Sequence, residues 1–324
     1  MHGSPARAGL NDLVLDLAEK SAAFRSSLPA SIAEPLADLV RAMNCYYSNL
    51  IEGHDTHPID IERAMRNDYS ADPKKRNLQL EARAHVAVQK WIDEDSMAEP
   101  PTAPASIIEL HRRFCELLPP ELLFVENPKT GEKIPVVPGE LRTRYVEVGR
   151  HIAVSPGAVP RFLDRMHTAY SLPGRIEPIL AAACAHHRLL WVHPFLDGNG
   201  RVARLMSYAM LRKTLDTRGL WSVARGLARQ DPRVRCIRRI GRRGLSGACP
   251  WCLLCFFFFL MLRRPPSSTQ GRSSAASDVY KSRLWSTSIP SSPTSVSAAI
   301  RDRVRTRFLP RDHGCAKTVL PPAS

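Results

Sequence analysis

The chain has 324 residues, enough for one large or two modest domains that each bury a core. Its formal net charge of +15 would be typical of a nucleic-acid or acidic-membrane partner if the charge covered one folded face. Residues 1–230 carry an excess of only +2, however, whereas residues 231–324 carry +13. The first part of the chain therefore gives no reason to expect nucleic acid as a partner.

Cysteine usage and the N-terminus indicate an intracellular protein. Three isolated cysteines, Cys45, Cys115 and Cys184, are too widely spaced for a disulfide framework. The first residues lack the basic segment and the apolar run of a secretion signal. We therefore expect residues 1–230 to work in the cytoplasm, with no membrane partner.

Apolar residues at helical spacing predict four helices before the Pro/Ala-rich segment 99–105. They cover residues 9–25, residues 32–53, a stretch that begins near Pro58, and residues 77–95. Gly53 is typical of a helix stop. In the third of these helices, Ile59, Ile61 and Met65 are expected to face inward.

Four further helices are predicted at residues 107–118, 159–172, 177–192 and 200–214. Residues 133–156 instead alternate apolar and polar side chains around Gly149 and Arg150, which predicts a short β-hairpin. The expected fold class is all-α with this one inserted hairpin. We divide the chain into an N-terminal helical region, 1–104, a core, 105–230, and a tail, 231–324.

The segment from His193 to Arg204, HPFLDGNGRVAR, links the last two predicted helices. Pro194 ends the first helix, so that His193 lies at its end and faces the space that the loop encloses. Gly198 and Gly200 permit backbone conformations closed to other residues. Successive N–H groups can therefore converge on one anion at the start of the next helix.

Charged side chains in this segment favour a polyphosphate over a single phosphate. Arg201 and Arg204 are three residues apart and share a face in the first helical turn. Asp197 supplies a carboxylate able to hold Mg²⁺ against phosphate oxygens. A lone histidine or a Gly-Asn-Gly turn is usually structural. Neither explanation accounts for His, Asp, two Gly and two Arg within twelve residues.

The same segment resembles the signature of the Fic family, His-Pro-Phe-x-Asp-Gly-Asn-Gly-Arg-x-x-Arg, and matches it at every defined position. The resemblance implies transfer of AMP from ATP, the cosubstrate, to a hydroxyl group of a target protein, with Mg²⁺ as cofactor. It implies that His193 is the base and that Asp197 holds the Mg²⁺. The ATP-binding residues that it implies are Gly198, Asn199 and Gly200 at the anion hole, Arg201 at the β-phosphate and Arg204 at the γ-phosphate.

Residues 139–154 resemble the flap of the same family, a hairpin that pairs with an extended segment of the target protein. Its docking residues would be Tyr145, Val146, Glu147 and Val148. An exposed strand edge recognises main chain without demanding a particular sequence, which suits modification of a protein side chain. Self-modification is expected by the same route.

The segment from Ser48 to Gly53, SNLIEG, resembles the inhibitory motif of Fic proteins that carry their inhibitory helix before the core. The resemblance implies that Ser48, Glu52 and Gly53 are regulatory. It also implies that Glu52 pairs with Arg204 and blocks the seat of the γ-phosphate. In some relatives the same Glu supports removal of AMP, which leaves a reverse activity open.

Two other functions stay open at this point. The chain could transfer another phosphate-containing group, as some Fic relatives do, although the intact series from Gly198 to Arg204 favours a triphosphate. It could instead be an antitoxin-like module that grips a nucleotide or a partner without turnover. Incubation of a lysate with α-labelled ATP separates these functions, because only an adenylyltransferase leaves label on protein.

The tail has a different character from the rest of the chain: it contains no Glu and loses helical periodicity. A single Cys-x-x-Cys, Cys249–Cys252, is a weak metal or redox signal. The apolar run Trp251–Leu262 is well short of the ~20 residues that cross a bilayer. The segment Cys255–Arg283 resembles a translated sequencing adapter. We therefore predict that the tail is non-native or disordered.

Cutting the chain after residue 230 should not lower its activity or its thermal stability, because every predicted helix and motif precedes that point. Thermal unfolding and labelling assays of the two chains measure this. A tail that proves protease-resistant and necessary for solubility contradicts the interpretation.

Overall fold

The structure, a computed structural model, describes residues 5–54, 56–127, 130–148, 151–171, 174, 177–228 and 317–320. The cysteine pair, the apolar run and the adapter-like segment of the tail lie outside these residues, so the interpretation of the tail stays a prediction. Within the described ranges, no helix has both the length and the apolar character that crossing a bilayer requires.

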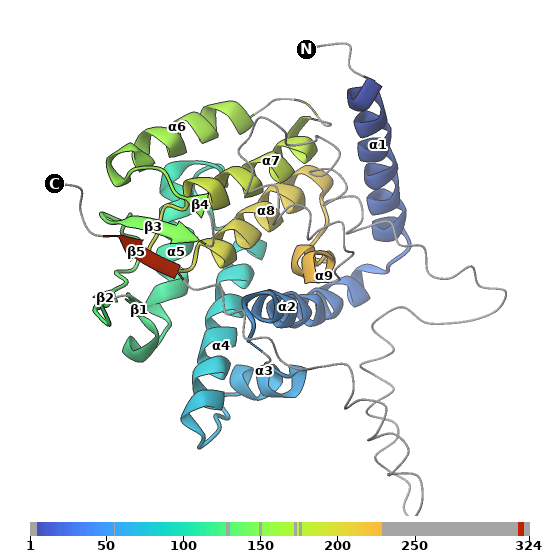
Figure 1. The fold of residues 1–324 in the computed structure, drawn as a ribbon. Coiled ribbons are helices and arrows are strands. Elements are labelled where there is room, and N and C mark those ends of the chain that lie inside the picture. The colour runs from blue at the N-terminus through green and yellow to red at the C-terminus, as the bar shows by residue number, and fades with distance from the viewer. Residues whose placement is uncertain are drawn as a thin grey trace, which may run out of the picture. The chain divides into compact units, whose positions relative to one another are not determined.

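Four helices form the N-terminal region, as the apolar spacing predicted (Figure 1). They are α1, Pro5–Ser26; α2, Ala30–Glu52; α3, Pro58–Met65; and α4, Pro73–Asp93. Helix α4 begins at Asp72, whose carboxylate accepts a hydrogen bond from the Lys74 N–H at 2.9 Å. Helix α2 ends at Gly53, which has a left-handed φ of 87° and donates its N–H to the Leu50 carbonyl at 3.1 Å.

The core helices follow in chain order after the Pro/Ala-rich segment (Figure 1). They are α5, Pro104–Glu116; α6, Val159–Tyr170; α7, Glu177–Val192; α8, Asn199–Leu215; and α9, Val223–Ala228. Helix α9 was not predicted, because six residues are too few to establish a periodicity. Two short 3-10 turns, Pro120–Leu122 and Pro156–Ala158, precede the strands and α6 respectively.

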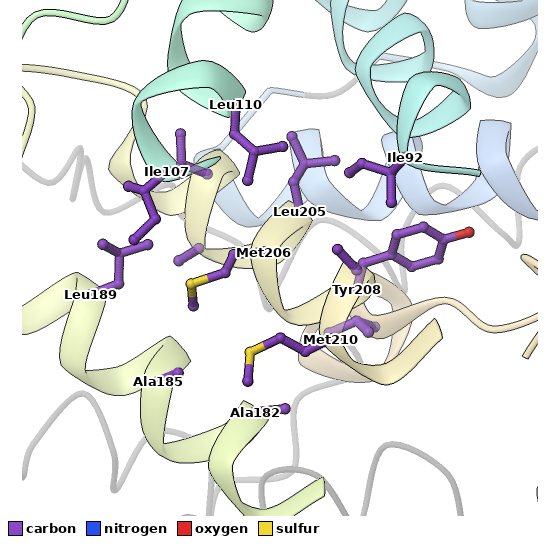
Figure 2. Packing of buried hydrophobic residues seen from close by; sticks show 14 of the residues in the cluster. Ile92, Ile107, Leu110, Ala182, Ala185, Leu189, Leu205, Met206, Tyr208 and Met210 are labelled. Atoms are coloured by element: carbon purple, nitrogen blue, oxygen red, sulfur yellow. The ribbon is translucent and has the colours of Figure 1, made fainter. Parts of the chain in front are cut away.

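Helix α8 is the buried centre of the fold (Figure 2). From its side chains, Leu205 and Met206 are fully buried and Tyr208 nearly so. Helix α7 lies along α8 and presents the small residues Ala182 and Ala185 to it, which allows a close approach of the two backbones. Because α8 is enclosed on all sides, its first turn is held rigidly at the functional loop.

Five short strands complete the described structure. They are β1, Phe124–Glu126; β2, Lys133–Pro135; β3, Tyr145–Val148; β4, His151–Ile152; and β5, Lys317–Leu320. Strands β3 and β4 form the predicted hairpin, with Val148 opposite His151. Strand β5 pairs antiparallel with the other edge of β3. The sequence analysis expected an exposed edge on this hairpin. The pairing of β5 with β3 differs from that expectation.

Two details of the predicted elements were wrong. A second hairpin, β1 with β2, exists where only one hairpin was expected. Its strands have three residues each, too short to show an alternation. In α3, Ile61 is fully buried as expected, but Ile59 and Met65 are 61% and 47% exposed. The buried face of this helix is completed by Ala64 instead.

Polar side chains tie the middle of α2 to its neighbours. Asn44 donates from Nδ2 to Gln89 Oε1 of α4 at 2.7 Å, and its Oδ1 accepts the N–H of Ala224 in α9 at 3.0 Å. Arg41 donates from Nε to Asp93 Oδ2 at the end of α4, at 2.9 Å. Asp93 also accepts the hydroxyl of Tyr208 from α8. These contacts fix α2 against both α4 and α8.

Candidate active site

The loop after α7 places His193 in a sparsely populated backbone conformation. Its φ is +52°, in the left-handed region that few residues other than glycine adopt. Its N–H still reaches back to the Leu189 carbonyl at 2.9 Å, so that the residue closes the last turn of α7. The side chain is held at this helix end, as the position of Pro194 predicted, and the residue is 6% exposed.

Two contacts give the rest of this loop a fixed shape. The side chain of Asn199 accepts the Phe195 N–H at 2.9 Å and donates to the Phe195 carbonyl at 2.8 Å. The Phe195 ring is fully buried and stacks on His111 of α5, with ring centroids 3.8 Å apart. The Asn199 side chain is therefore used to close the loop, and only its backbone N–H is left for an anion.

Gly198 and Gly200 line the start of α8. Gly198 has a φ of +76° and is the N-cap of the helix. A methyl group at Gly198 would lie 3.3 Å from Cδ2 of His111, so the ring sits directly beneath the turn. The N–H groups of the first turn and the positive end of the helix dipole both favour an anion at such a turn.

His111 supports the loop as a neutral side chain. Its Nδ1 accepts the N–H of Gly139 at 2.9 Å, and burial lowers its pKa to about 4. A neutral ring at pH 7 adds no positive charge beneath the turn at Gly198. No sequence pattern indicated this role.

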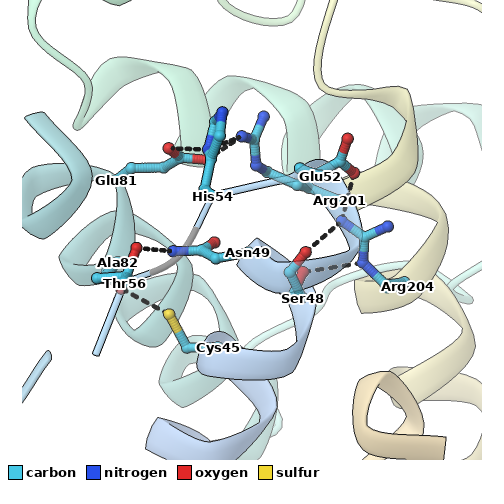
Figure 3. Close-up of polar contacts among 10 residues, drawn as sticks. All are labelled: Cys45, Ser48, Asn49, Glu52, His54, Thr56, Glu81, Ala82, Arg201 and Arg204. Carbon is cyan, nitrogen blue, oxygen red and sulfur yellow. Dashed lines mark hydrogen bonds and ion pairs between the residues drawn. The ribbon is translucent and has the colours of Figure 1, made fainter. Parts of the chain in front are cut away.

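Arg204 is held by Ser48 and Glu52 of α2 (Figure 3). Its Nε donates to Ser48 Oγ at 2.8 Å, and its Nη2 donates to Glu52 Oε1 at 2.6 Å. Ser48 and Glu52 are four residues apart, so they share one face of α2. The guanidinium is only 6% exposed, whereas the Glu52 side chain is 30% exposed.

Glu52 also covers the anion site. A methyl group at Gly200 would overlap Glu52 Oε1, which shows how closely the carboxylate lies over the first turn of α8. The carboxylate therefore occupies space beside the N–H groups that an anion would use. Two further histidines near Arg204 carry no charge there, because burial lowers the pKa of His85 and of His186 to about 3.

Arg201 has a carboxylate partner of its own, Glu81 in the middle of α4 (Figure 3). Glu81 also contacts Nδ1 of His54 through Oε2, at 2.8 Å. The side chains of Arg201 and Glu81 are 9% and 4% exposed. Burial lowers the pKa of Arg201 to about 10, a value that leaves the guanidinium charged at neutral pH.

Asp197 is the residue of this site that could hold a metal ion. It is half-buried and directly precedes the turn at Gly198. Among the residues that the structure describes, no three His, Cys, Asp or Glu side chains gather as a metal cage. Mg²⁺ commonly takes only one or two protein carboxylates and completes its shell with water and substrate phosphates. One carboxylate beside an anion nest fits that chemistry.

The predicted docking residues lie on β3. Val146 is fully buried, and Tyr145, Glu147 and Val148 are half-buried. Both edges of the strand carry main-chain partners, β4 on one side and residues 317–320 on the other. The second partner lies where a target segment was expected.

The buried central helix α8 thus begins at a glycine turn that follows, five residues later, a histidine in a strained conformation. Such a helix start has the features of an anion-binding site. The Fic/DOC family model matches residues 101–211, which include this turn. The match covers about a third of the chain and lies almost entirely within the core region, so this part of the chain is similar to a Fic domain.

Curated relatives carry the name protein adenylyltransferase Fic. The protein from Drosophila willistoni is 28% identical over 172 residues, 52% of this chain and 31% of that protein. The one from Drosophila melanogaster is 27% identical over 172 residues, 52% of this chain and 32% of that protein. The match thus spans about a third of the length of these relatives.

Solved structures share the fold. A Fic family protein from Desulfovibrio desulfuricans G20 has a TM-score of 0.59 at 16% identity, covering 80% of this chain and 73% of that one. Fic-1 from C. elegans has a TM-score of 0.51 at 21% identity, covering 74% of this chain and 71% of that one. At these identities the likeness concerns the fold alone.

Replacing Glu81 by Gln should destabilise the protein by about 3 kcal/mol, because it leaves the buried Arg201 without its counter-charge. The matched control is Glu132→Gln, which breaks the ion pair with Arg144 at the surface (3.0 Å, with side chains 49% and 39% exposed). That change should cost less than about 1 kcal/mol. Urea unfolding at pH 7 measures both. Equal losses would contradict the buried pairing.

Proposed function

We propose that this protein transfers AMP from ATP to a hydroxyl group of a target protein and that its own α2 inhibits the reaction. The observation that carries the proposal is the arrangement of His193 beside an anion nest with two arginines on the same helical face. A triphosphate needs several anion subsites in a row, and this turn offers them within one helix start.

The nucleotide would bind with its phosphates along the first turn of α8. The N–H groups at Gly198 to Gly200 would bind phosphate oxygens, with Arg201 on the β-phosphate side and Arg204 at the γ-phosphate. A Mg²⁺ ion held by Asp197 would neutralise phosphate charge. The Asn199 side chain takes no part, because it is bound to the Phe195 backbone.

His193 would act as the general base for the target hydroxyl. The hydroxyl oxygen attacks the α-phosphorus, its proton passes to the imidazole, and the bond to the β-phosphate oxygen breaks. The products are the AMP-modified protein and pyrophosphate. Fixed N–H donors at the start of α8 would stabilise the charge that develops on the α-phosphate oxygens.

The target would dock on the flap by strand addition. In support, β3 accepts an extended antiparallel segment on the edge opposite β4, where Lys317 to Leu320 pair with it through main chain. A target segment, or another copy of the chain in self-modification, would take the same edge. The three free cysteines among the described residues, Cys45, Cys115 and Cys184, favour the cytoplasm as the place of action.

Inhibition would come from the position of Glu52. Its carboxylate holds Arg204 and covers the turn at Gly200. A γ-phosphate in that place would meet a like charge, so ATP either binds weakly or binds with its α-phosphate out of line. The 30% exposure of the Glu52 side chain is consistent with a group that is displaced.

Replacing His193 by Ala should lower AMP transfer by ~10²-fold or more while ATP binding persists, because the base is lost and the anion nest is retained. Transfer is measured with α-labelled ATP, and binding is measured by calorimetry. The control is His57→Ala, an exposed histidine at the start of α3. Lost ATP binding together with retained transfer would defeat the assignment.

Replacing Glu52 by Gly should raise self-modification above that of the wild type. The change frees Arg204 and uncovers Gly200, at a cost to helix stability of roughly 1 kcal/mol. The control is Glu34→Gly, an exposed position of the same helix with the same loss of helix propensity. Label incorporated from α-labelled ATP is compared at equal folded protein.

Adding Arg204→Ala to Glu52→Gly should abolish the gain, because the γ-phosphate loses its partner. If Glu52→Gly and Glu34→Gly behave alike, Glu52 is an ordinary helix residue. The inhibitory role then fails, while the transferase proposal is judged by the wild-type label and by the His193 variant.

A further inference from the structure

Arg142 is a buried arginine outside the motif, and its charge is held in an unusual way. The residue is 3% exposed, and none of the ion pairs found between described residues includes it. Burial lowers its pKa to about 10, so it stays protonated at neutral pH. An arginine buried without a carboxylate must be compensated by acceptors of another kind.

The acceptors are backbone carbonyls at the end of α7. Arg142 Nε donates to the His193 carbonyl at 2.7 Å, and Nη2 donates to the Val192 carbonyl at 3.3 Å. Its own backbone N–H donates to the Pro194 carbonyl at 2.9 Å. The last carbonyls of a helix lack helical partners and form the negative end of its dipole, so a cation is favoured there.

These bonds also hold the strained conformation of His193. A φ of +52° persists only where the surroundings determine it. Arg142 binds the carbonyls of the residues at and on either side of this torsion. The direction in which the imidazole leaves the chain thus depends on one guanidinium.

The same guanidinium also binds the chain on both sides of the flap hairpin, before β3 and after β4. Nη1 donates to the carbonyl of Arg144, just before β3, at 2.9 Å. Nη2 also donates to the carbonyl of Val154, two residues after β4. A planar group with donors in several fixed directions can join these segments, whereas the single nitrogen of a lysine cannot.

We propose that Arg142 is a positioning residue, which sets the distance between a hydroxyl docked on the flap and the His193 imidazole. The inference rests on the proposed transferase function and on flap docking. Beyond that function, the inference states that the Arg142 side chain fixes the position of the flap relative to His193. A displacement of about 1 Å between reacting groups costs on the order of 10²-fold in rate.

The test uses Arg142→Lys and Arg142→Ala, each in the Glu52→Gly chain and in the wild type. Two products of α-labelled ATP are measured together: label on protein and free AMP released by transfer to water. Water does not dock on the flap, so the ratio of protein label to free AMP should fall by at least tenfold in both variants. Calorimetry should find ATP affinity within about threefold of the parent, because the anion nest is untouched.

The ratio is independent of how much protein is folded, so partial unfolding of Arg142→Ala does not obscure the result. The control is Arg144→Ala, whose side chain pairs with Glu132 at the surface, and it should keep the parent ratio. A ratio unchanged in both Arg142 variants would overturn the inference and leave Arg142 a purely structural residue. Absence of protein label in every parent chain would instead defeat the proposed function.

Discussion

Two neighbouring guanidinium groups are buried at the start of α8, and the fold depends on keeping both charges compensated. The side chains of Arg201 and Arg204 are 9% and 6% exposed. Their counter-charges, Glu81 and Glu52, both come from helices that precede the family match at residues 101–211. The helices α2 and α4 are therefore electrostatically part of the core. The boundary at residue 104 is a division of the sequence only, because ion pairs of the site cross it.

The two carboxylates are held in different ways, and the difference supports the proposed division between a structural and a regulatory carboxylate. Glu81 lies in the middle of a 21-residue helix and is bound by His54 as well as Arg201. Glu52 is the last residue of α2 and is partly exposed. In the proposed mechanism, an incoming phosphate would displace the partly exposed carboxylate at the helix end rather than the buried one.

The sequence could predict those features whose residues lie close together along the chain. The loop from His193 to Arg204 contains its histidine, glycines and arginines within twelve residues, and helical spacing located eight of the helices that the structure describes. Contacts between distant residues had no such signal. Glu81 and Arg201 are 120 positions apart, and Arg142 acts through carbonyls, which any residue supplies. A glutamate within the apolar face of α4, four residues before His85, was the one hint of a buried partner.

The contacts along α2 limit how its C-terminal end could move in the proposed inhibition. Asn44 is bound to α4 and α9, and Arg41 is bound to Asp93, which also receives Tyr208 from α8. Departure of the whole helix would break each of these contacts at once. The final turn lies beyond these anchors and has contacts of its own, from Ser48 to Arg204 and from Asn49 to Thr56. Under the proposed inhibition, release would therefore involve Glu52 at the helix end while the body of α2 stays docked.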